Sequence, residues 1–230
     1  MNHKPFKSKS IFQETTNTLK LLSDNNLLYC YNPPVLQTNK DEIIITWTSH
    51  FSGRVNCEHY FGSIEQYLTF IENNAYTCML FDGSIIRAYY KFQNNGNEVL
   101  SNHSLLWWPS PYKFNMDEDA IDISVHERIK EYVFLPNLHE NIKMRSPMRF
   151  DYDITSDSDT HPLSHAHLQN NDCRIFIDRP LCFNKFIRFI FENFYVEKYK
   201  LYDFWDDLEY LKVKNTKMPV LNDRAYISWS

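Results

Sequence analysis

The sequence predicts a single α+β domain over residues 1–230, with an antiparallel sheet and flanking helices. Two observations predict this class. Three β-rich segments separated by short turns lie between Tyr76 and Trp108, as in a meander of antiparallel strands. Segments with helical apolar spacing lie on either side of this meander. We therefore expect an N-terminal portion of about residues 1–75 to pack on a sheet-plus-helix portion of about residues 76–230.

The N-terminal portion is expected to contain two helices and one strand. Apolar residues recur at helical spacing over residues 10–22. Residues 41–48 are rich in β-branched side chains and bounded by polar turns, which indicates a strand. The stretch SIEQYLTFIEN, which begins at Ser63, predicts a second helix with a capping box formed by Ser63 and Gln66.

Turn signals divide the rest of the chain into further elements. Asp82 and Gly83 end the first strand of the meander, the stretch NNGN ends the second, and Pro109 closes the third. The remaining elements are expected to be a helix at 117–130, a strand at 147–154, strands within 165–177, a helix from residue 183, a helical piece at about 199–210 and an edge strand at 225–230.

The composition limits the classes of function. Only 4 residues are Gly, and neither phosphate-loop motif, G-x-G-x-x-G or G-x-x-x-x-G-K-[ST], occurs. The net charge of −5 gives no global attraction to nucleic acid, although a local basic patch remains compatible with it. The 5 cysteines have no C-x-x-C spacing, which favours a reducing, cytoplasmic setting. No apolar run is long enough to cross a bilayer, so no membrane partner is expected.

The stretch DYDITSDSDTHPLSHAHL carries the candidate site. Alternate side chains of a strand share a face, so Arg149, Asp151 and Asp153 would lie together along MRFDYDI. By the same rule His165 and His167 would share a face of the next strand. If the two segments pair, these five side chains form one surface. The site hypothesis requires Asp153, His165 and His167 to meet within hydrogen-bonding reach, and the enzyme hypothesis loses most of its support if they do not.

Three alternatives remain open for such a cluster. Imidazoles and carboxylates suit a divalent metal, for which His161, His165 and His167 are candidate ligands, although no metal is required by the pattern. A metal-free site would use the two histidines as acid and base, with Arg149 or Arg174 to stabilise phosphate charge. The third alternative is a purely structural polar cluster. Motifs of common nucleophilic enzymes, such as G-x-S-x-G and H-E-x-x-H, are absent.

Two further groups are candidates for substrate binding. Trp107 and Trp108 would provide a stacking platform for bases, or would simply pack over the two faces of one strand. Arg87 shares a face with Tyr89 and Lys91 and would line a groove, or would be a solvated cation on an exposed face.

Four blocks in this order resemble a bacterial family known as domain of unknown function 2290. They are HSLLWWPSP, MRFDYD, HPLSHAHL and CRIFIDRPLCFNKFIRFIFENFY, and the resemblance extends over nearly the whole chain. The family brings no established activity. The resemblance therefore implies a shared fold unit without naming a reaction.

A second resemblance is to the TumE toxins of bacterial toxin–antitoxin pairs. The blocks FDGSIIRAYYKF, RFDYD, SHAHL and LCFNKFIRFIFENF follow one another as in that family, over about residues 81–195. The chain departs from the family's pattern in an acidic insert that carries His161, in Ile154 where the family has Asn, and in a large N-terminal addition. The resemblance implies a toxin or anti-phage defence protein that acts on RNA, with a cognate antitoxin or defence-complex protein as partner.

The leading hypothesis combines these observations. It is a cytoplasmic nuclease, with ribonuclease activity favoured, in which His165 and His167 act as acid and base. Asp153 or Asp151 would orient an imidazole, and Arg149 would stabilise phosphate charge. The alternative is a non-catalytic recognition or adaptor subunit of a defence or toxin–antitoxin complex, in which the His/Asp cluster is structural.

Overall fold

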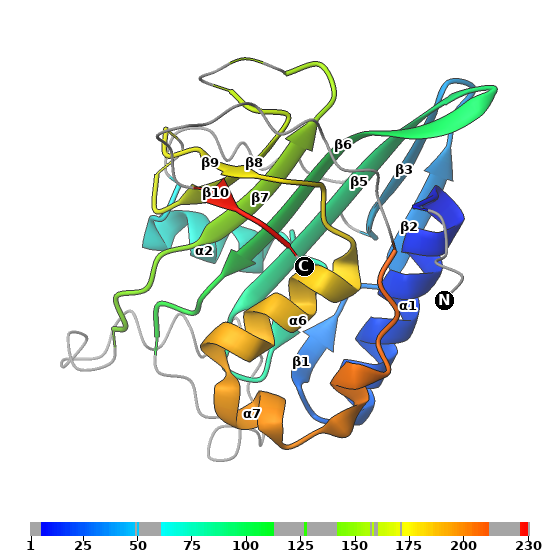
Figure 1. The fold of residues 1–230 in the computed structure, drawn as a ribbon. Coiled ribbons are helices and arrows are strands. Elements are labelled where there is room, and N and C mark those ends of the chain that lie inside the picture. Colours follow the sequence, from blue (N-terminus) through cyan, green and yellow to red (C-terminus); the bar gives the residue numbers. More distant parts are fainter. Residues whose placement is uncertain are drawn as a thin grey trace.

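The structure is a computed structural model that describes residues 6–48, 50, 61–112, 127, 142–156, 158, 161–170, 172–211 and 226–229. Over these residues the chain forms an α+β domain with helices packed against a ten-stranded sheet (Figure 1). In chain order the elements are α1 (Ser8–Asp24), β1 (Leu28–Tyr31), β2 (Pro34–Thr38), β3 (Glu42–Trp47), α2 (Ile64–Glu72), β4 (Cys78–Leu80), β5 (Ile85–Asn95), β6 (Asn97–Trp108), β7 (Met148–Asp153), β8 (Ser164–Leu168), β9 (Ile175–Ile177), α6 (Phe183–Phe194), α7 (Val196–Lys200), the 3-10 helix η1 (Asp203–Asp206) and β10 (Tyr226–Ile227). The predicted fold class is confirmed.

The sheet is built around the long β5–β6 hairpin, which turns at Gly96, where φ is +83°. Glycine adopts a positive φ without steric cost, so the NNGN stretch forms the turn that it predicts. β7, β8, β9 and β10 follow β6 in that order. On the other side β5 pairs with both β4 and β3, which in turn pair with β1 and β2. The β9–β10 pair is parallel and the other pairs are antiparallel.

Successive residues of β6 enter two hydrophobic clusters on opposite faces of the sheet. Leu105 and Trp107 belong to the larger cluster, which also contains buried residues of α1 and α6. Leu106 and Trp108 belong to a smaller cluster with Tyr67 of α2. Side chains alternate along a strand, so the two clusters must lie on different faces. Figure 1 shows α1 and α6 in front of the sheet and α2 behind it.

A buried carboxyl group joins α1 to the start of α6. Glu14 of α1 is 9% exposed, and its Oε1 accepts a 2.7 Å hydrogen bond from the backbone nitrogen of Asn184. Thr18, one turn further along α1, donates to Asn184 Oδ1. The first backbone N–H groups of a helix have no partner within it, so Glu14 caps α6 from another helix. Burial raises the pKa of Glu14 to about 7, against the opposing effect of its hydrogen bond from Asn184.

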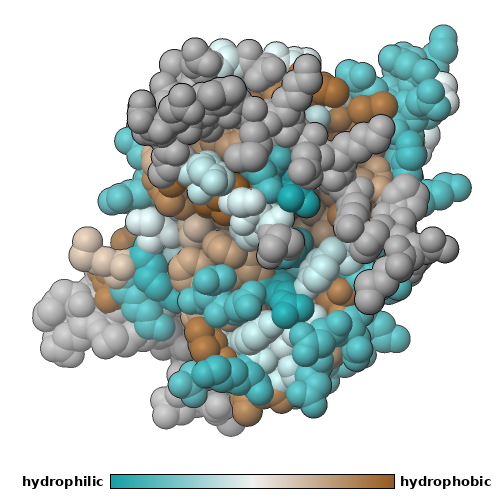
Figure 2. Space-filling model, viewed as in Figure 1, coloured by the Kyte–Doolittle hydropathy of each residue, from teal (hydrophilic) through white to brown (hydrophobic). Residues whose placement is uncertain are grey.

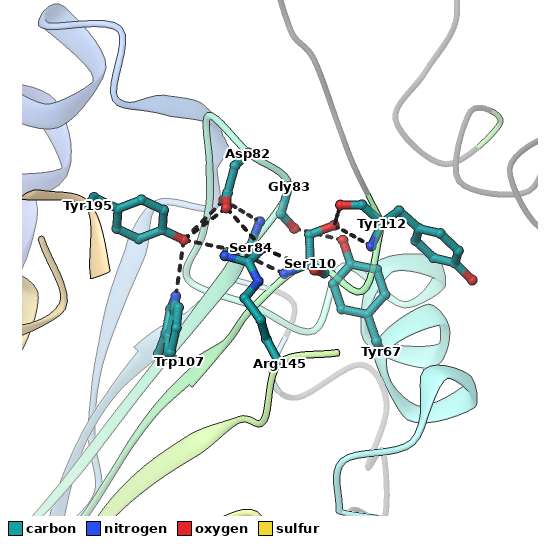
Figure 3. Close-up of polar contacts among 9 residues, drawn as sticks. All are labelled: Tyr67, Asp82, Gly83, Ser84, Trp107, Ser110, Tyr112, Arg145 and Tyr195. Carbon is teal, nitrogen blue, oxygen red and sulfur yellow. Dashed lines mark hydrogen bonds and ion pairs between the residues drawn. The ribbon is translucent and has the colours of Figure 1, made fainter. Parts of the chain in front are cut away.

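A buried polar network holds the turn between β4 and β5 (Figure 3). Asp82 accepts hydrogen bonds from Tyr195 Oη at 3.1 Å and from Arg145 Nη2 at 3.2 Å. Tyr67 of α2 donates to the carbonyl oxygen of Gly83 at 2.7 Å. The network ties this turn to α2, to the end of α6 and to the segment that precedes β7.

The surface around α6 and α7 is largely hydrophilic, with hydrophobic residues showing between the polar ones (Figure 2). The projecting end of the β5–β6 hairpin is also hydrophilic, and Gln93, Asn94, Asn95 and Asn97 are exposed there. Among the helices of the described chain, none combines the length and apolar composition that a bilayer crossing requires.

Several element predictions differ from the structure. β1 and β2 were not predicted; β1 is a four-residue strand, and β2 begins at Pro34 on the edge of the sheet. The single helical piece expected at 199–210 is wrong, because α7 ends at Lys200 and only the short η1 follows. There Trp205 is buried against Phe191 and Phe204. The expected edge strand is β10, and the expected helix at 117–130 lies outside the described residues apart from residue 127.

We predict that Glu14→Gln removes a pH-dependent loss of stability. The folded state holds the Glu14 proton up to about pH 7, whereas the unfolded chain releases it near pH 4.5. The wild type should therefore lose about 1–3 kcal/mol of unfolding free energy as the pH rises between these values. Urea unfolding at pH 5 and pH 8 measures this change, which should shrink in the variant. The exposed Glu197→Gln is the control, and an equal change in all three proteins would contradict the prediction.

Candidate functional site

The candidate site lies on the face of the sheet opposite α1 and α6, where β6, β7 and β8 pair side by side. Arg149 of β7 pairs with His167 of β8, and Asp151 pairs with His165. On the other edge of β7, Asp151 pairs with Ser104 of β6. Directly paired residues of antiparallel strands place their side chains on the same face. The predicted pairing of the two segments is confirmed, and with it their shared face.

Asp151, His165 and His167 bring one ligand atom each to within 4.8 Å of the others. The Nε2 atoms of His165 and His167 are 3.1 Å apart. Nε2 of His167 is also 3.2 Å from Oδ2 of Asp151. Asp151 therefore lies within hydrogen-bonding reach of His167, which in turn contacts His165. Among the described residues, the side-chain contacts found for Asp153 are with Thr155 and not with either imidazole, so the expected meeting of Asp153 with the two histidines is not seen.

Asp151 has two further partners. Its Oδ2 accepts a 2.7 Å hydrogen bond from Nε of Arg149, and its Oδ1 accepts a 2.8 Å hydrogen bond from Oγ of Ser104. Burial alone would raise the pKa of Asp151, but the contacts with His167 and Arg149 outweigh it and hold the pKa well below its ordinary value. Asp151 is therefore an anion at neutral pH, held in place from three sides.

The two histidines are almost fully buried, with exposures of 1% for His165 and 2% for His167. Burial lowers the pKa of His165 to about 4, although its contact with the Pro162 carbonyl opposes this shift. Nδ1 of His165 lies 2.8 Å from that carbonyl oxygen, which can only accept. A neutral His165 therefore carries its proton on Nδ1 and presents the lone pair of Nε2 to the site. Nδ1 of His167 has no hydrogen-bond partner among the described residues.

These side chains line a pocket of about 420 Å³, called here the polar pocket. It contains the whole predicted catalytic set, together with Arg174, His161 and Ser104. The His161 ring packs edge-on against His165, with the ring centroids 4.7 Å apart. The acidic insert thus brings a third histidine to the pocket wall.

The two aspartates of β7 differ in their contacts. Asp151 contacts His167, whereas Asp153 accepts hydrogen bonds from the backbone nitrogen and Oγ1 of Thr155, at 2.8 and 2.7 Å. Asp153 therefore holds the turn after β7 at the rim of the polar pocket. The structure assigns the imidazole contact to Asp151, between the two candidates that the sequence left open.

The predicted substrate-binding residues fall in three places. Arg174 lines the polar pocket, and Arg87 and Trp108 line a neighbouring pocket on the same face. Trp107 points to the opposite face, where it is 2% exposed and its ring lies 4.3 Å from that of Phe194. The structure therefore does not bring Trp107 to the site. Ser104 was missed by the sequence reasoning, because its role depends on the β6–β7 register.

The model of the uncharacterized conserved protein family DUF2290 matches residues 22–228 of the chain. The chain belongs to this family. The match extends from the end of α1 to β10, so the DUF2290 unit includes the whole candidate site and confirms the first resemblance. No curated protein and no solved structure matches the chain. The chemistry of this DUF2290 protein must therefore be inferred from its site.

The spacing of the donor atoms in the DUF2290 site favours one of the open alternatives. An acid and a base that act on one phosphate must lie on either side of it, but the two Nε2 atoms are only 3.1 Å apart. Ligands of a tetrahedral zinc ion lie about 2.0–2.1 Å from the metal and hence about 3.3 Å from one another. Two of the three pairs, at 3.1 and 3.2 Å, are close to that edge length, and the third pair, His165 and Asp151, lies within 4.8 Å. A shared cation would draw His165 and Asp151 closer together.

We predict that Asp151→Asn destabilises the DUF2290 fold by about 2–4 kcal/mol, because it leaves the Arg149 guanidinium without its buried anion. Asp153→Asn is the matched control, on the same strand and face, and should change stability by less than about 0.5 kcal/mol. Urea unfolding in EDTA measures both. The pKa of Asp151 is held low, so its contribution is present at pH 7 and persists to about pH 5. Equal stability of the two variants would contradict the prediction.

Proposed function

We propose that this DUF2290 protein is a divalent-metal-dependent hydrolase that cleaves phosphodiester bonds of nucleic acid, with RNA as the preferred substrate. One observation carries the proposal. Three ligand atoms, from the partly buried Asp151 and the buried His165 and His167, converge at the polar pocket. Two imidazoles and a carboxylate brought together at a pocket are a candidate set of metal ligands.

The donor set indicates the class of metal. Two imidazoles and one carboxylate suit Zn²⁺, Mn²⁺ or Fe²⁺, and three protein ligands leave further positions for water and substrate. The contact of His165 Nδ1 with the Pro162 carbonyl is the outer contact that commonly orients a histidine ligand. The neutral form of His165 is also the form that binds a metal.

The cations around the polar pocket favour a phosphate substrate. Arg149 and Arg174 both line it, in a protein whose net charge is −5. Guanidinium groups match phosphate oxygens and stabilise the charge of a phosphoryl transition state. A metal would lower the pKa of a bound water and polarise the phosphoryl group. With Asp151, His165 and His167 holding the metal, an activated water would form a new P–O bond as the P–O bond to the sugar breaks, and its proton would pass to the leaving sugar oxygen.

The biological setting of the proposal is a bacterial toxin–antitoxin or anti-phage defence system, with RNA as target and a cognate antitoxin or defence-complex protein as partner. It is supported by the resemblance of the DG, DYD and HAH blocks to TumE toxins. These blocks contribute the β4–β5 turn and the strands β7 and β8. Cleavage of cellular RNA would arrest growth, which is the expected effect of such a protein.

We predict that the purified protein binds close to one equivalent of divalent metal, and that His165→Ala combined with His167→Ala abolishes binding. Elemental analysis after loading with Zn²⁺ or Mn²⁺ measures the metal. Cleavage of a mixed-sequence RNA should require the metal, stop on addition of EDTA, and fall by more than about a hundredfold in the double variant. Asp153→Asn, in the same pocket but outside the ligand set, should keep the metal and most of the activity.

The outcomes separate the parts of the proposal. Cleavage that persists in EDTA would overturn the metal dependence and restore the acid–base alternative. Stoichiometric metal without cleavage of RNA or DNA would overturn the nuclease. A wild type with neither metal nor cleavage, together with a double variant that loses its fold by circular dichroism, would favour the non-catalytic adaptor subunit, in which the His/Asp cluster is structural.

A further inference from the structure

A second pocket, of about 310 Å³, lies beside the polar pocket on the same face of the sheet. We call it the aromatic pocket because five aromatic side chains line it: Trp47, Phe61, Phe70, Tyr89 and Trp108. Arg149 and Ser104 line both pockets. The two pockets are therefore neighbours that share one wall.

The rings of the aromatic pocket are held by the core beneath them. Trp108 contacts Phe70 edge-on at 5.3 Å and Phe61 edge-on at 5.7 Å between ring centroids. Trp47, Phe70 and Trp108 are each no more than 3% exposed. Tyr89 is half-buried and stacks on His50 at 5.5 Å. The pocket thus has a rigid floor and more accessible aromatic side chains at its edge.

Two guanidinium groups lie among these rings. Cζ of Arg87 is 4.2 Å from the centroid of the Phe70 ring and 4.9 Å from that of Trp47. Cζ of Arg149 is 5.3 Å from the Phe61 ring, while its Nε donates to Asp151 in the polar pocket. The pocket wall therefore combines aromatic rings with two positive charges. A planar ligand that carries negative charge matches both features.

We propose that the aromatic pocket binds the base of a nucleotide whose phosphate lies at Arg149 in the polar pocket. This inference rests on the proposed function and names the part of the substrate next to the scissile bond. Base–aromatic stacking and stacking on arginine are both sequence-tolerant, so the pocket would position RNA without selecting one base. A volume of 310 Å³ is at the lower end of ligand pockets and suits a single nucleotide unit.

The shared wall explains how one residue would serve both groups of the ligand. Arg149 faces Phe61 on one side and Asp151 on the other. A guanidinium in this position can hydrogen-bond a phosphate oxygen while its flat face remains against the aromatic pocket. The phosphate would then lie next to Asp151, His165 and His167, where the proposed reaction takes place.

Titration calorimetry in EDTA tests this inference without any contribution from a bound metal. Adenosine and uridine monophosphates should each bind at least about tenfold more tightly than ribose 5-phosphate, which lacks a base. Tyr89→Ala should remove most of this difference. Tyr31→Ala, an exposed tyrosine of β1 outside the pocket, should retain it. Phe61→Ala is a second pocket variant that does not alter a strand, and it should act like Tyr89→Ala.

Equal affinities for the nucleotides and ribose 5-phosphate in the wild type would overturn the inference. A base-dependent difference that survives in both folded pocket variants would also overturn it. These results are distinguishable from failure of the proposed function. If the protein binds metal and cleaves RNA but binds nucleotides no more tightly than ribose 5-phosphate, the proposed hydrolase stands and the proposed role of the aromatic pocket is wrong. If it binds nucleotides more tightly but shows neither metal nor cleavage, the role of the aromatic pocket stands and the proposed hydrolase is wrong.

Discussion

The antiparallel pairing of β6, β7 and β8 is the constraint on which both the core and the site depend. Alternate residues of β7 serve opposite faces, so Phe150 enters the core under α6 while Arg149 and Asp151 face the polar pocket. A slip of one residue would exchange these faces and place a buried charge under α6. Burial of Phe150 and Ala166 thus fixes the register, and the register in turn sets the distance between Asp151 and the histidines.

Three carboxyl groups of low exposure show how structural polar groups differ from a candidate reactive one. Glu14 caps α6 through backbone N–H groups, and Asp82 bonds Tyr195 and Arg145 within the polar network at the β4–β5 turn. Both have partners that join elements of the fold. Asp151 also has structural partners, in Ser104 and Arg149, but its remaining contact is an imidazole at a pocket. That difference in partners, more than burial, distinguishes the candidate site.

The sequence predicted the features that depend on neighbouring residues, such as a helix cap and the alternation of side chains along a strand. The Ser63 half of the expected capping box forms, with Oγ accepting from the backbone nitrogen of Gln66. The DYD and HAH alternation placed five side chains on one face. The sequence could not choose between Asp151 and Asp153, because the choice depends on which residue lies opposite His165 in the register. Ser104 was hidden for the same reason. β1 and β2 were missed because both are short strands, with little periodicity to detect.

The polar network at the β4–β5 turn also bears on how the chain reaches its fold. Tyr195 is 113 residues away from Asp82, yet its hydroxyl group binds the turn between two early strands. During synthesis the Asp82 carboxylate lacks its hydrogen bond from Tyr195 until α6 has left the ribosome and packed on the sheet. The hairpins that precede it can form beforehand, but a contact of such long range closes late. Docking of α6 and completion of this turn are therefore linked, and loss of either removes a partner from the other.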